Sequence, residues 1–132
     1  MNGTDPRDCL FCLDIEAARN GVAANDLAVA RYDNFPISKG HTLIVPRRHI
    51  ADWFDLTNDE QAAILALARE VRATLTTSLA PDGWNIGLNI GAAGGQTLAH
   101  AHLHLIPRYA GDRPDPRGGV RWTLPDQARY WD

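Results

Sequence analysis

The sequence predicts an α+β domain: an antiparallel sheet of about five strands, one long helix on a face of that sheet, and a short N-terminal helix. Two observations predict it. Residues 58–79 carry a long amphipathic helical pattern, and short apolar segments precede and follow that pattern. A chain of 132 residues can bury one core, so we expect a single domain over residues 1–132.

Composition narrows the function classes. The chain is 45% hydrophobic and 22% charged, which is typical of a globular protein. The formal net charge of −3 lacks the basic excess of a general nucleic-acid binder. No apolar run approaches the ~20 residues of a membrane span, and the N-terminus lacks an apolar signal segment. We therefore expect a cytoplasmic protein with no nucleic-acid or membrane partner.

The first half of the chain predicts one short helix and two strands. Residues 1–8 are polar and expected to be loose, and the apolar residues within 10–18 favour a short helix or turn. Residues 27–32 and 41–46 have the apolar, branched composition of strands. The second of these is apolar almost throughout, so we expect it to be buried on both faces.

The long helix has clear start and stop signals. Thr57 and Glu60 have the spacing of a capping box, and Pro81 and Gly83 follow the last turn. Between them, apolar residues at spacings of three and four form one stripe. The stripe consists of Ile64, Leu67, Ala68, Val71, Leu75 and Leu79.

The next segment predicts an antiparallel hairpin. Residues 84–90 alternate apolar with small or polar residues, and residues 99–108 form a second strand-like run. A glycine-rich loop, residues 91–97, joins them. Asn89, at the end of the first strand, is then expected to face His102 across the hairpin.

Three histidines alternate along the second strand of this hairpin. Because side chains on a strand alternate between faces, His100, His102 and His104 should share one face, with Ala101 and Leu103 on the core side. Three interpretations remain open for such a row. It can be a structural cluster, a metal-binding face, or a covalent catalytic site in which one imidazole is the nucleophile.

The glycine-rich loop just before the histidines favours the catalytic interpretation. Glycines allow successive backbone N–H groups to turn inward and form an anion-binding nest, although an ordinary hairpin loop has the same composition. Beside three imidazoles, a phosphate-sized anion site suits attack by histidine on phosphorus. Gln96 and Thr97 would donate hydrogen bonds to the phosphate oxygens, and Gly95 belongs to the same loop.

The two cysteines, Cys9 and Cys12, have the spacing of a zinc site or of a redox pair. A redox pair is expected at the turn between a strand and a helix, whereas these cysteines precede every candidate strand. At the other end, residues 109–132 form a glycine-, proline- and arginine-rich loop and an aromatic tail. That tail is either a solvated segment docked by its aromatic residues, or a contact to a partner subunit or to phosphates.

Three segments together resemble the histidine triad nucleotide-binding family. Residues 89–108 contain its His-x-His-x-His-apolar-apolar signature, residues 33–49 are similar to its first block, and residues 9–12 are similar to the N-terminus of its zinc-bearing branch. The resemblance implies the family fold and a two-fold homodimer with a continuous sheet. It also implies that the backbone carbonyl of His100 holds the proton of His102, leaving the other imidazole nitrogen free to attack.

The resemblance also implies residue roles. His102 is the expected nucleophile, and His104 would contact the phosphate or the leaving group. Asn89 would contact the same region, and Asp33 would bind the ribose hydroxyl groups, although an aspartate here also suits a turn. For the base we expect an apolar pocket formed by Phe11, Ile15 and Ile44, and we interpret His41 as a structural histidine.

A structural zinc ion is expected at Cys9, Cys12, His49 and His100. Two thiolates and two imidazoles form a closed tetrahedral Cys2His2 set, although a reduced and unliganded cysteine pair is the alternative. Such a site would fix His100 and, through its backbone, His102. Arg47 and Arg48 stand where many members of the family have lysine-containing pairs, which preserves the charge.

The function implied is hydrolysis of a nucleotidyl phosphoanhydride or phosphoramidate bond through a nucleotidyl-histidine. The expected substrates are purine nucleotides, namely dinucleoside polyphosphates such as diadenosine tetraphosphate, or nucleoside phosphoramidates. Two alternatives stay open. One is nucleotidyl transfer to a phosphorylated acceptor, as in galactose-1-phosphate uridylyltransferase, which has Gln where His104 stands. The other is a nucleotide-binding regulatory adaptor.

Overall fold

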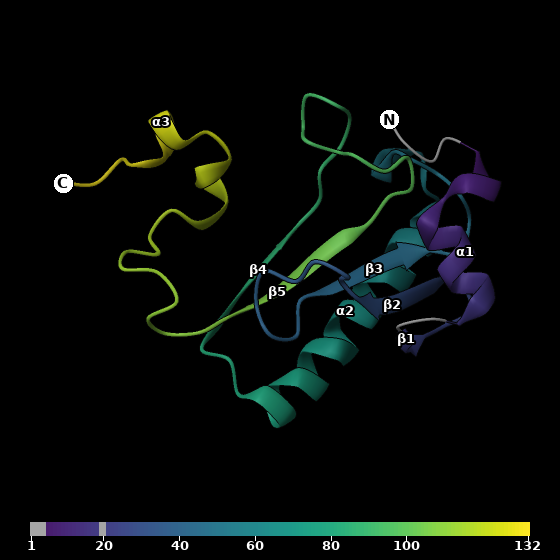
Figure 1. The fold of residues 1–132 in the computed structure, drawn as a ribbon, viewed down its shortest axis with the longest axis horizontal. Helices are drawn as coiled ribbons and strands as arrows, with labels where there is room; N and C mark the ends of the chain where they lie inside the picture. The colour runs from purple at the N-terminus through teal and green to yellow at the C-terminus, as the bar shows by residue number, and fades with distance from the viewer. Residues whose placement is uncertain (1–4, 19–20) are drawn as a thin grey trace.

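The computed structural model describes residues 5–18 and 21–132, and a five-stranded antiparallel sheet lies at its centre (Figure 1). The strand order is β1-β2-β3-β5-β4. The strands are β1 (Gly21–Ala24), β2 (Ala28–Tyr32), β3 (Thr42–Pro46), β4 (Gly83–Gly87) and β5 (Leu103–Arg108). The predicted α+β class is confirmed, and β1 is a strand that the sequence analysis did not identify.

One long helix, α2 (Asn58–Leu79), lies across one face of the sheet (Figure 1). Its bounds match the prediction because the capping box is present: the Thr57 hydroxyl accepts from the Glu60 N–H at 3.1 Å. Its apolar stripe packs on alternate residues of the strands and forms the main core. The buried residues of that core include Ile44, Ile64, Leu67, Val71, Leu75, Leu103 and Leu105.

The short helix α1 (Leu10–Ala17) covers part of the opposite face. Phe11, which is 2% exposed, packs with Leu43 and Val45 of β3. Because side chains of β3 alternate, Ile44 points to α2 while its two neighbours point to α1. The strand is therefore buried on both faces, as its apolar sequence predicts.

Strands β4 and β5 form the predicted hairpin, but both are shorter than expected. Only His104 lies within β5; His100 and His102 belong to the segment that enters it. The alternation nevertheless holds, because Ala101 and Leu103 are buried in the core beneath α2 while His102 and His104 face one cavity.

The two ends of the chain differ from the simple expectation. Within the N-terminal segment predicted to be loose, Pro6–Asp8 forms a 3-10 helix, η1, while residues 1–4 lie outside the described part. After β5, the chain projects away from the sheet and contains η3 (Gly119–Thr123) and α3 (Pro125–Ala128) (Figure 1). No helix in the described ranges is both long and apolar enough to cross a bilayer.

The aromatic residues of this C-terminal segment pack on arginines of the same segment. Arg117 lies 4.7 Å from the ring centroid of Trp131, and Arg121 lies 4.7 Å from that of Tyr130. Both distances are typical of cation–π contacts. The predicted docking by aromatic residues thus takes place within the segment.

Candidate active site and metal centre

Two thiols and two imidazoles from three distant segments meet beside α1. Cys9 is the N-cap of the helix and Cys12 lies in its first turn, while His49 follows β3 and His100 precedes β5. The Nδ1 atom of His100 lies 3.4 Å from each thiol Sγ and 3.2 Å from Nδ1 of His49. Cys12 Sγ lies 3.3 Å from His49 Nδ1. All four ligands predicted from the sequence are therefore brought together.

These separations fit a tetrahedral zinc ion. With Zn–S near 2.3 Å and Zn–N near 2.0 Å, the edges of the tetrahedron measure about 3.3 Å between nitrogens, about 3.5 Å between nitrogen and sulfur, and about 3.8 Å between sulfurs. His100 donates its Nε2–H to the carbonyl of Pro46 at 2.8 Å, which leaves the Nδ1 lone pair directed at the cluster. Burial raises the pKa of the Cys12 thiol to about 12, so a thiolate here requires a cation that compensates its charge. The donor set and the geometry thus suit a closed structural zinc site.

His102 is held in one tautomer by the backbone. Its Nδ1 donates to the carbonyl of His100 at 2.8 Å, and a carbonyl can only accept. The Nε2 atom therefore carries the lone pair. Burial lowers the pKa of His102, opposed by this hydrogen bond, so the ring is neutral at pH 7. A neutral imidazole with a defined lone pair has the form required of a nucleophile.

His102 lines a cavity of about 380 Å³ that lies between α1, β2 and the glycine-rich loop. The ring centroid of Phe11 lies 5.0 Å from that of His102 at one wall. The other side chains and backbone segments that line it include Leu10, Arg31, Asp33, Leu43, Asn89, Gly95, Thr97 and His104. Of the residues predicted to bind phosphate or ribose, Gln96 alone is absent from this lining.

A fourth histidine, which the sequence analysis interpreted as structural, determines the orientation of the third. His41 Nδ1 accepts the N–H of Ile37 at 3.2 Å, so its proton resides on Nε2. That Nε2 lies 3.0 Å from Nδ1 of His104 and donates to it. His104 consequently carries its own proton on Nε2. Burial lowers the pKa of His41 and, with the neighbouring His102, lowers the pKa of His104 to about 4, so both rings are neutral.

The same hydrogen bonds argue against a metal ion at Asp33, His41 and His104, whose polar atoms also cluster. A metal ion at Nε2 of His41 would force a proton onto Nδ1, where it would oppose the N–H of Ile37. The predicted row of histidines is thus divided between two sites. His100 joins the zinc ligands, whereas His102 and His104 face the cavity.

Asp33 makes a turn contact and also lines the cavity, where its ribose-binding role stays a prediction. Its Oδ1 accepts the N–H of Phe35 at 2.9 Å, which is the turn contact. Its Oδ2 lies 3.4 Å from His41 Nε2, and the residue lines the cavity. Asn89 lies two residues beyond β4, where the pairing of Gly87 with His104 would place it opposite His102 if it continued.

Gln96 does not have the role expected of it. Its side-chain Nε2 donates to the carbonyls of Ala51 and Leu98, and its Oε1 accepts the N–H of Gly91 at 3.0 Å. Both ends of the amide are therefore engaged, and the residue is 4% exposed. Gln96 shapes the loop instead of donating to a phosphate.

The anion nest expected in the glycine-rich loop is also corrected. The N–H groups of Gly94, Gly95 and Gln96 all donate to carbonyls within residues 91–92, closing a tight turn. These three N–H groups are consequently bonded to acceptors of the loop itself, and do not form the expected nest for an anion. Thr97, exposed at the cavity, is the loop residue that offers a hydroxyl there.

Two of the three residues expected to form the base pocket lie elsewhere. Side chains on β3 alternate between the two faces of the sheet. Ile44 is therefore fully buried beneath α2, and its neighbour Leu43 faces the cavity. Ile15 lines a different hollow behind α1. Phe11 alone of the three lines the cavity, as predicted. Every residue of β3 is buried, so an apolar composition alone does not indicate which of its side chains face the cavity.

Comparison with known proteins agrees with this geometry. The HIT domain family matches residues 14–111. This chain belongs to the HIT domain family. An uncharacterized HIT-like protein of Saccharolobus solfataricus is 37% identical over 109 residues, covering 81% of this chain and 78% of that protein. An AP-4-A phosphorylase of Mycobacterium tuberculosis is 36% identical over 92 residues, which is 69% of this chain and 47% of that longer protein.

A solved HIT structure bears directly on the metal. The zinc-bound histidine triad family protein of Mycobacterium smegmatis has a TM-score of 0.74 and 29% identity, and the match covers 84% of this chain and 86% of that one. Together with the four converging ligands, this assigns the chain to the zinc-bearing branch of the HIT family. Zinc is its cofactor, and the position of the ion beside α1 gives it a structural role, since all four ligands come from the protein.

Proposed function

We propose that this HIT protein hydrolyses nucleotidyl phosphoanhydride or phosphoramidate bonds through a nucleotidyl-histidine at His102. The observation that supports it best is the hydrogen bond from Nδ1 of His102 to the carbonyl of His100, which leaves a neutral Nε2 as nucleophile. The substrates proposed are dinucleoside polyphosphates, such as diadenosine tetraphosphate, or nucleoside phosphoramidates. The membership of the HIT family supports activity on nucleotides.

The reaction proceeds in two displacements. Nε2 of His102 attacks the α-phosphorus, a P–N bond forms, and the leaving group departs with the electrons of its bond to phosphorus. Water then adds to phosphorus, its proton passes to solvent, and the P–N bond breaks with its electrons returning to Nε2. Each displacement is easier than the direct attack of water.

Other side chains orient the substrate in this scheme. The Nε2–H of His104 donates to a phosphate or leaving-group oxygen, and Thr97 offers its hydroxyl at the same end of the cavity. The Asp33 carboxylate accepts the ribose hydroxyls. Donors aimed in advance at growing negative charge lower the barrier. Zinc, when bound, supplies structural support by fixing His100, and no step passes through it.

Phosphate is an alternative acceptor to water. The M. tuberculosis relative is described as a phosphorylase, an enzyme whose acceptor is phosphate. The two possibilities differ in product. Hydrolysis of diadenosine tetraphosphate at the α-phosphorus releases AMP, whereas phosphorolysis at the same atom releases ADP.

The decisive experiment is to trap the intermediate. Wild-type protein is mixed with diadenosine tetraphosphate or adenosine 5′-phosphoramidate, quenched in alkali, and analysed by peptide mass spectrometry for adenylylation of His102. The products are then compared with and without orthophosphate. AMP under both conditions supports hydrolysis, while ADP with phosphate supports the transferase. Nucleotide binding without turnover of either substrate would instead favour a regulatory adaptor.

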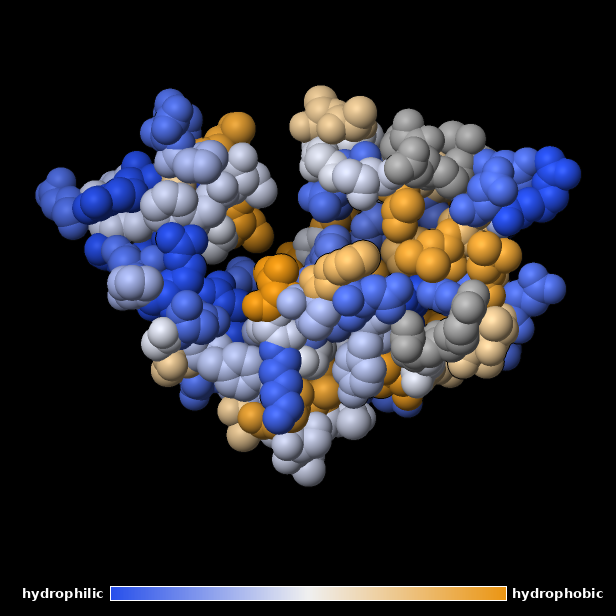
Figure 2. Space-filling model, viewed as in Figure 1, coloured by the Kyte–Doolittle hydropathy of each residue, from blue (hydrophilic) through white to orange (hydrophobic). Residues whose placement is uncertain are grey.

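We also propose that two copies associate as the homodimer typical of the family. Strand β4 lies at an edge of the sheet, so its outer side is available for contact with a second copy. Val120 and Leu124 of the C-terminal segment are 64% and 67% exposed. Figure 2 shows the notch between that segment and the body of the domain. Light scattering during gel filtration would give twice the monomer mass.

A further inference from the structure

A buried ion pair stands at the wall of the cavity formed by β2, where Arg31 pairs with Leu43 of β3 and Leu43 pairs with His104 of β5. Arg31 of β2 and Asp14 of α1 are 2% and 4% exposed, and the Arg31 Nη1 donates to Asp14 Oδ2. Arg31 Nε also donates to the carbonyl of Tyr32 at 3.2 Å. The guanidinium carbon lies 5.4 Å from the ring centroid of Phe11. An arginine is thus fixed beside an aromatic wall of the nucleotide cavity.

Its position along the strand corresponds to the base of a bound nucleotide. Arg31 and Asp33 both line the cavity, whereas the intervening Tyr32 is 45% exposed and lines another hollow. Two residues of a strand span about 7 Å, which is close to the distance from a ribose hydroxyl to a purine ring. With phosphorus at His102 and ribose at Asp33, the base therefore reaches Arg31.

The free donors of Arg31 favour one kind of base. Nη2 makes no hydrogen bond to any residue in the ranges 5–18 and 21–132. An arginine has donors only, so it pairs with acceptors. On the same edge, guanine and hypoxanthine offer two acceptors, O6 and N7, whereas adenine offers N7 beside an amino group that is itself a donor.

We propose that Arg31 makes the nucleoside end of this site selective for 6-oxopurines over adenine. This inference rests on the proposed function, since it concerns the base of the nucleotide that His102 would attack. Asp14 acts as a positioning residue. Arg31 lines both the cavity and the hollow behind α1, whereas Asp14 lines that hollow alone, so Asp14 holds the guanidinium without contacting the base. A buried ion pair is weak evidence of stabilisation, since apolar residues often replace one without loss of stability.

The test is calorimetric binding of GMP, IMP and AMP to the zinc-loaded wild-type protein. GMP and IMP should both bind at least about tenfold tighter than AMP, because hydrogen bonds to a charged donor discriminate by about that factor. Equal binding of AMP and GMP would overturn the inference. The inference would also be overturned if GMP bound tightly while IMP bound as weakly as AMP. Recognition would then depend on the 2-amino group of guanine, which hypoxanthine lacks.

A charge-balanced variant isolates the ion pair. Asp14→Leu combined with Arg31→Met removes both charges of the ion pair together. We expect it to bind GMP and AMP equally, because the base contact is lost while the phosphate and ribose contacts remain. A retained preference for GMP would overturn the inference. Arg69→Met, on the exposed side of α2, is the matched control and should keep the wild-type preference.

Failure of this inference is distinguishable from failure of the proposed function. If AMP and GMP bind equally and His102 is still nucleotidylated, the inference is wrong and the proposed function stands. If none of the three nucleotides binds and no nucleotidyl-enzyme forms, both are wrong. Should the double variant not fold, the wild-type series with GMP, IMP and AMP decides alone.

Discussion

The backbone carbonyl of His100 accepts a hydrogen bond from Nδ1 of His102 at 2.8 Å, while the side chain of His100 is a zinc ligand. One residue therefore joins the cluster that would hold zinc to the proposed nucleophile. A structural metal can in this way influence chemistry without contacting the substrate.

The first prediction concerns His102 itself. His102→Ala should lower kcat below about one-thousandth of the wild-type value, because no other side chain in the cavity offers a lone pair in the same position. Nucleotide binding, measured by calorimetry, should change little. Asp33→Asn is the contrasting variant: it should weaken ribose binding and still form the nucleotidyl-enzyme. Substantial turnover by His102→Ala would remove this residue from the nucleophilic role.

The second prediction concerns His41, which acts through His104. His41→Leu removes the donor to His104 Nδ1, so His104 no longer has a fixed proton on Nε2. We expect kcat to fall about tenfold with KM nearly unchanged, less than the loss when a phosphate donor itself is deleted. His41→Gln, which retains an N–H near the same point, should recover most of the rate. Equal activity of the Leu and Gln variants would show that only the volume of the side chain matters.

The third prediction concerns zinc. Elemental analysis of purified protein should find about one zinc ion per chain. Cys12→Ser should lose that zinc and lower Tm by at least about 5 °C, because metal binding contributes to folding free energy. Leu13→Ser is a matched control, since the neighbouring Leu13 is 40% exposed and outside the ligand set. Retention of both zinc and Tm by Cys12→Ser would contradict the assignment.

Local signals explain why part of the structure was predictable. The α2 helix begins where the sequence predicts because the capping box and the apolar stripe are contained within its own residues. The metal ligands were found because residues 9–12 resemble the zinc-bearing branch of the family and because two thiolates and two imidazoles form a tetrahedral set. By contrast, β1 has only four residues, Gly21–Ala24, and their small side chains give a weak strand pattern.

Features that depend on distant pairing were missed. His41 lies just before β3 and meets His104 because Leu43 pairs with His104 across β3 and β5. That register joins residues far apart in sequence, so no local sequence pattern predicts the contact between His41 and His104. Likewise, one of the three hydrogen bonds of the Gln96 amide goes to the carbonyl of Ala51, which lies in another loop. A polar residue beside a candidate site can therefore serve the loop that carries the site.

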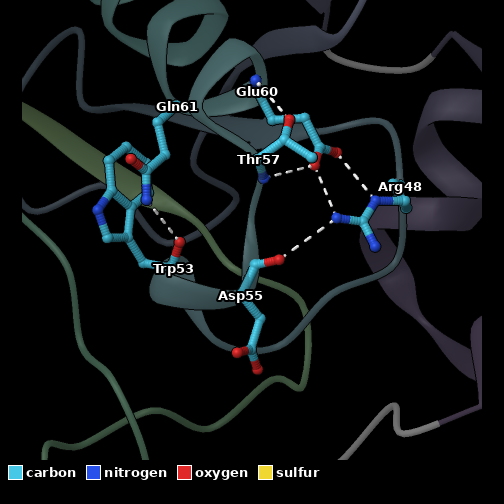
Figure 3. A network of polar contacts seen from close by, with 6 residues as sticks. All are labelled: Arg48, Trp53, Asp55, Thr57, Glu60 and Gln61. Carbon is cyan, nitrogen blue, oxygen red and sulfur yellow. Dashed lines mark hydrogen bonds and ion pairs between the residues drawn. The ribbon is translucent and has the colours of Figure 1, made fainter.

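The last prediction concerns the loop that carries His49. Arg48 donates to both carboxylate oxygens of Glu60, at 2.7 and 3.1 Å, and Glu60 also accepts the N–H of Thr57 (Figure 3). Figure 3 also shows Arg48 donating to the carbonyl of Asp55. The network joins the segment after β3 to the first turn of α2, and so supports a zinc ligand from outside the metal cluster.

The hydrogen bonds from Arg48 lower the pKa of Glu60 to about 2, from an ordinary value of 4.5. A carboxylate with a depressed pKa stabilises the folded state fully above pH 4.5 and loses that contribution as pH falls toward 2. Glu60→Gln keeps a capping side chain and removes the charge. It should lower the free energy of unfolding at pH 7 by about 1 kcal/mol, because half-exposed Arg48 is screened by solvent. Urea titrations from pH 7 to pH 3 should show that the difference in unfolding free energy between the wild type and Glu60→Gln shrinks below pH 4.5. The control variant is Asp59→Asn, which lies in the same helical turn but outside the network and should not show this pH dependence. A difference that stays constant down to pH 3 would mean that packing, and not the charge of Glu60, supports this loop.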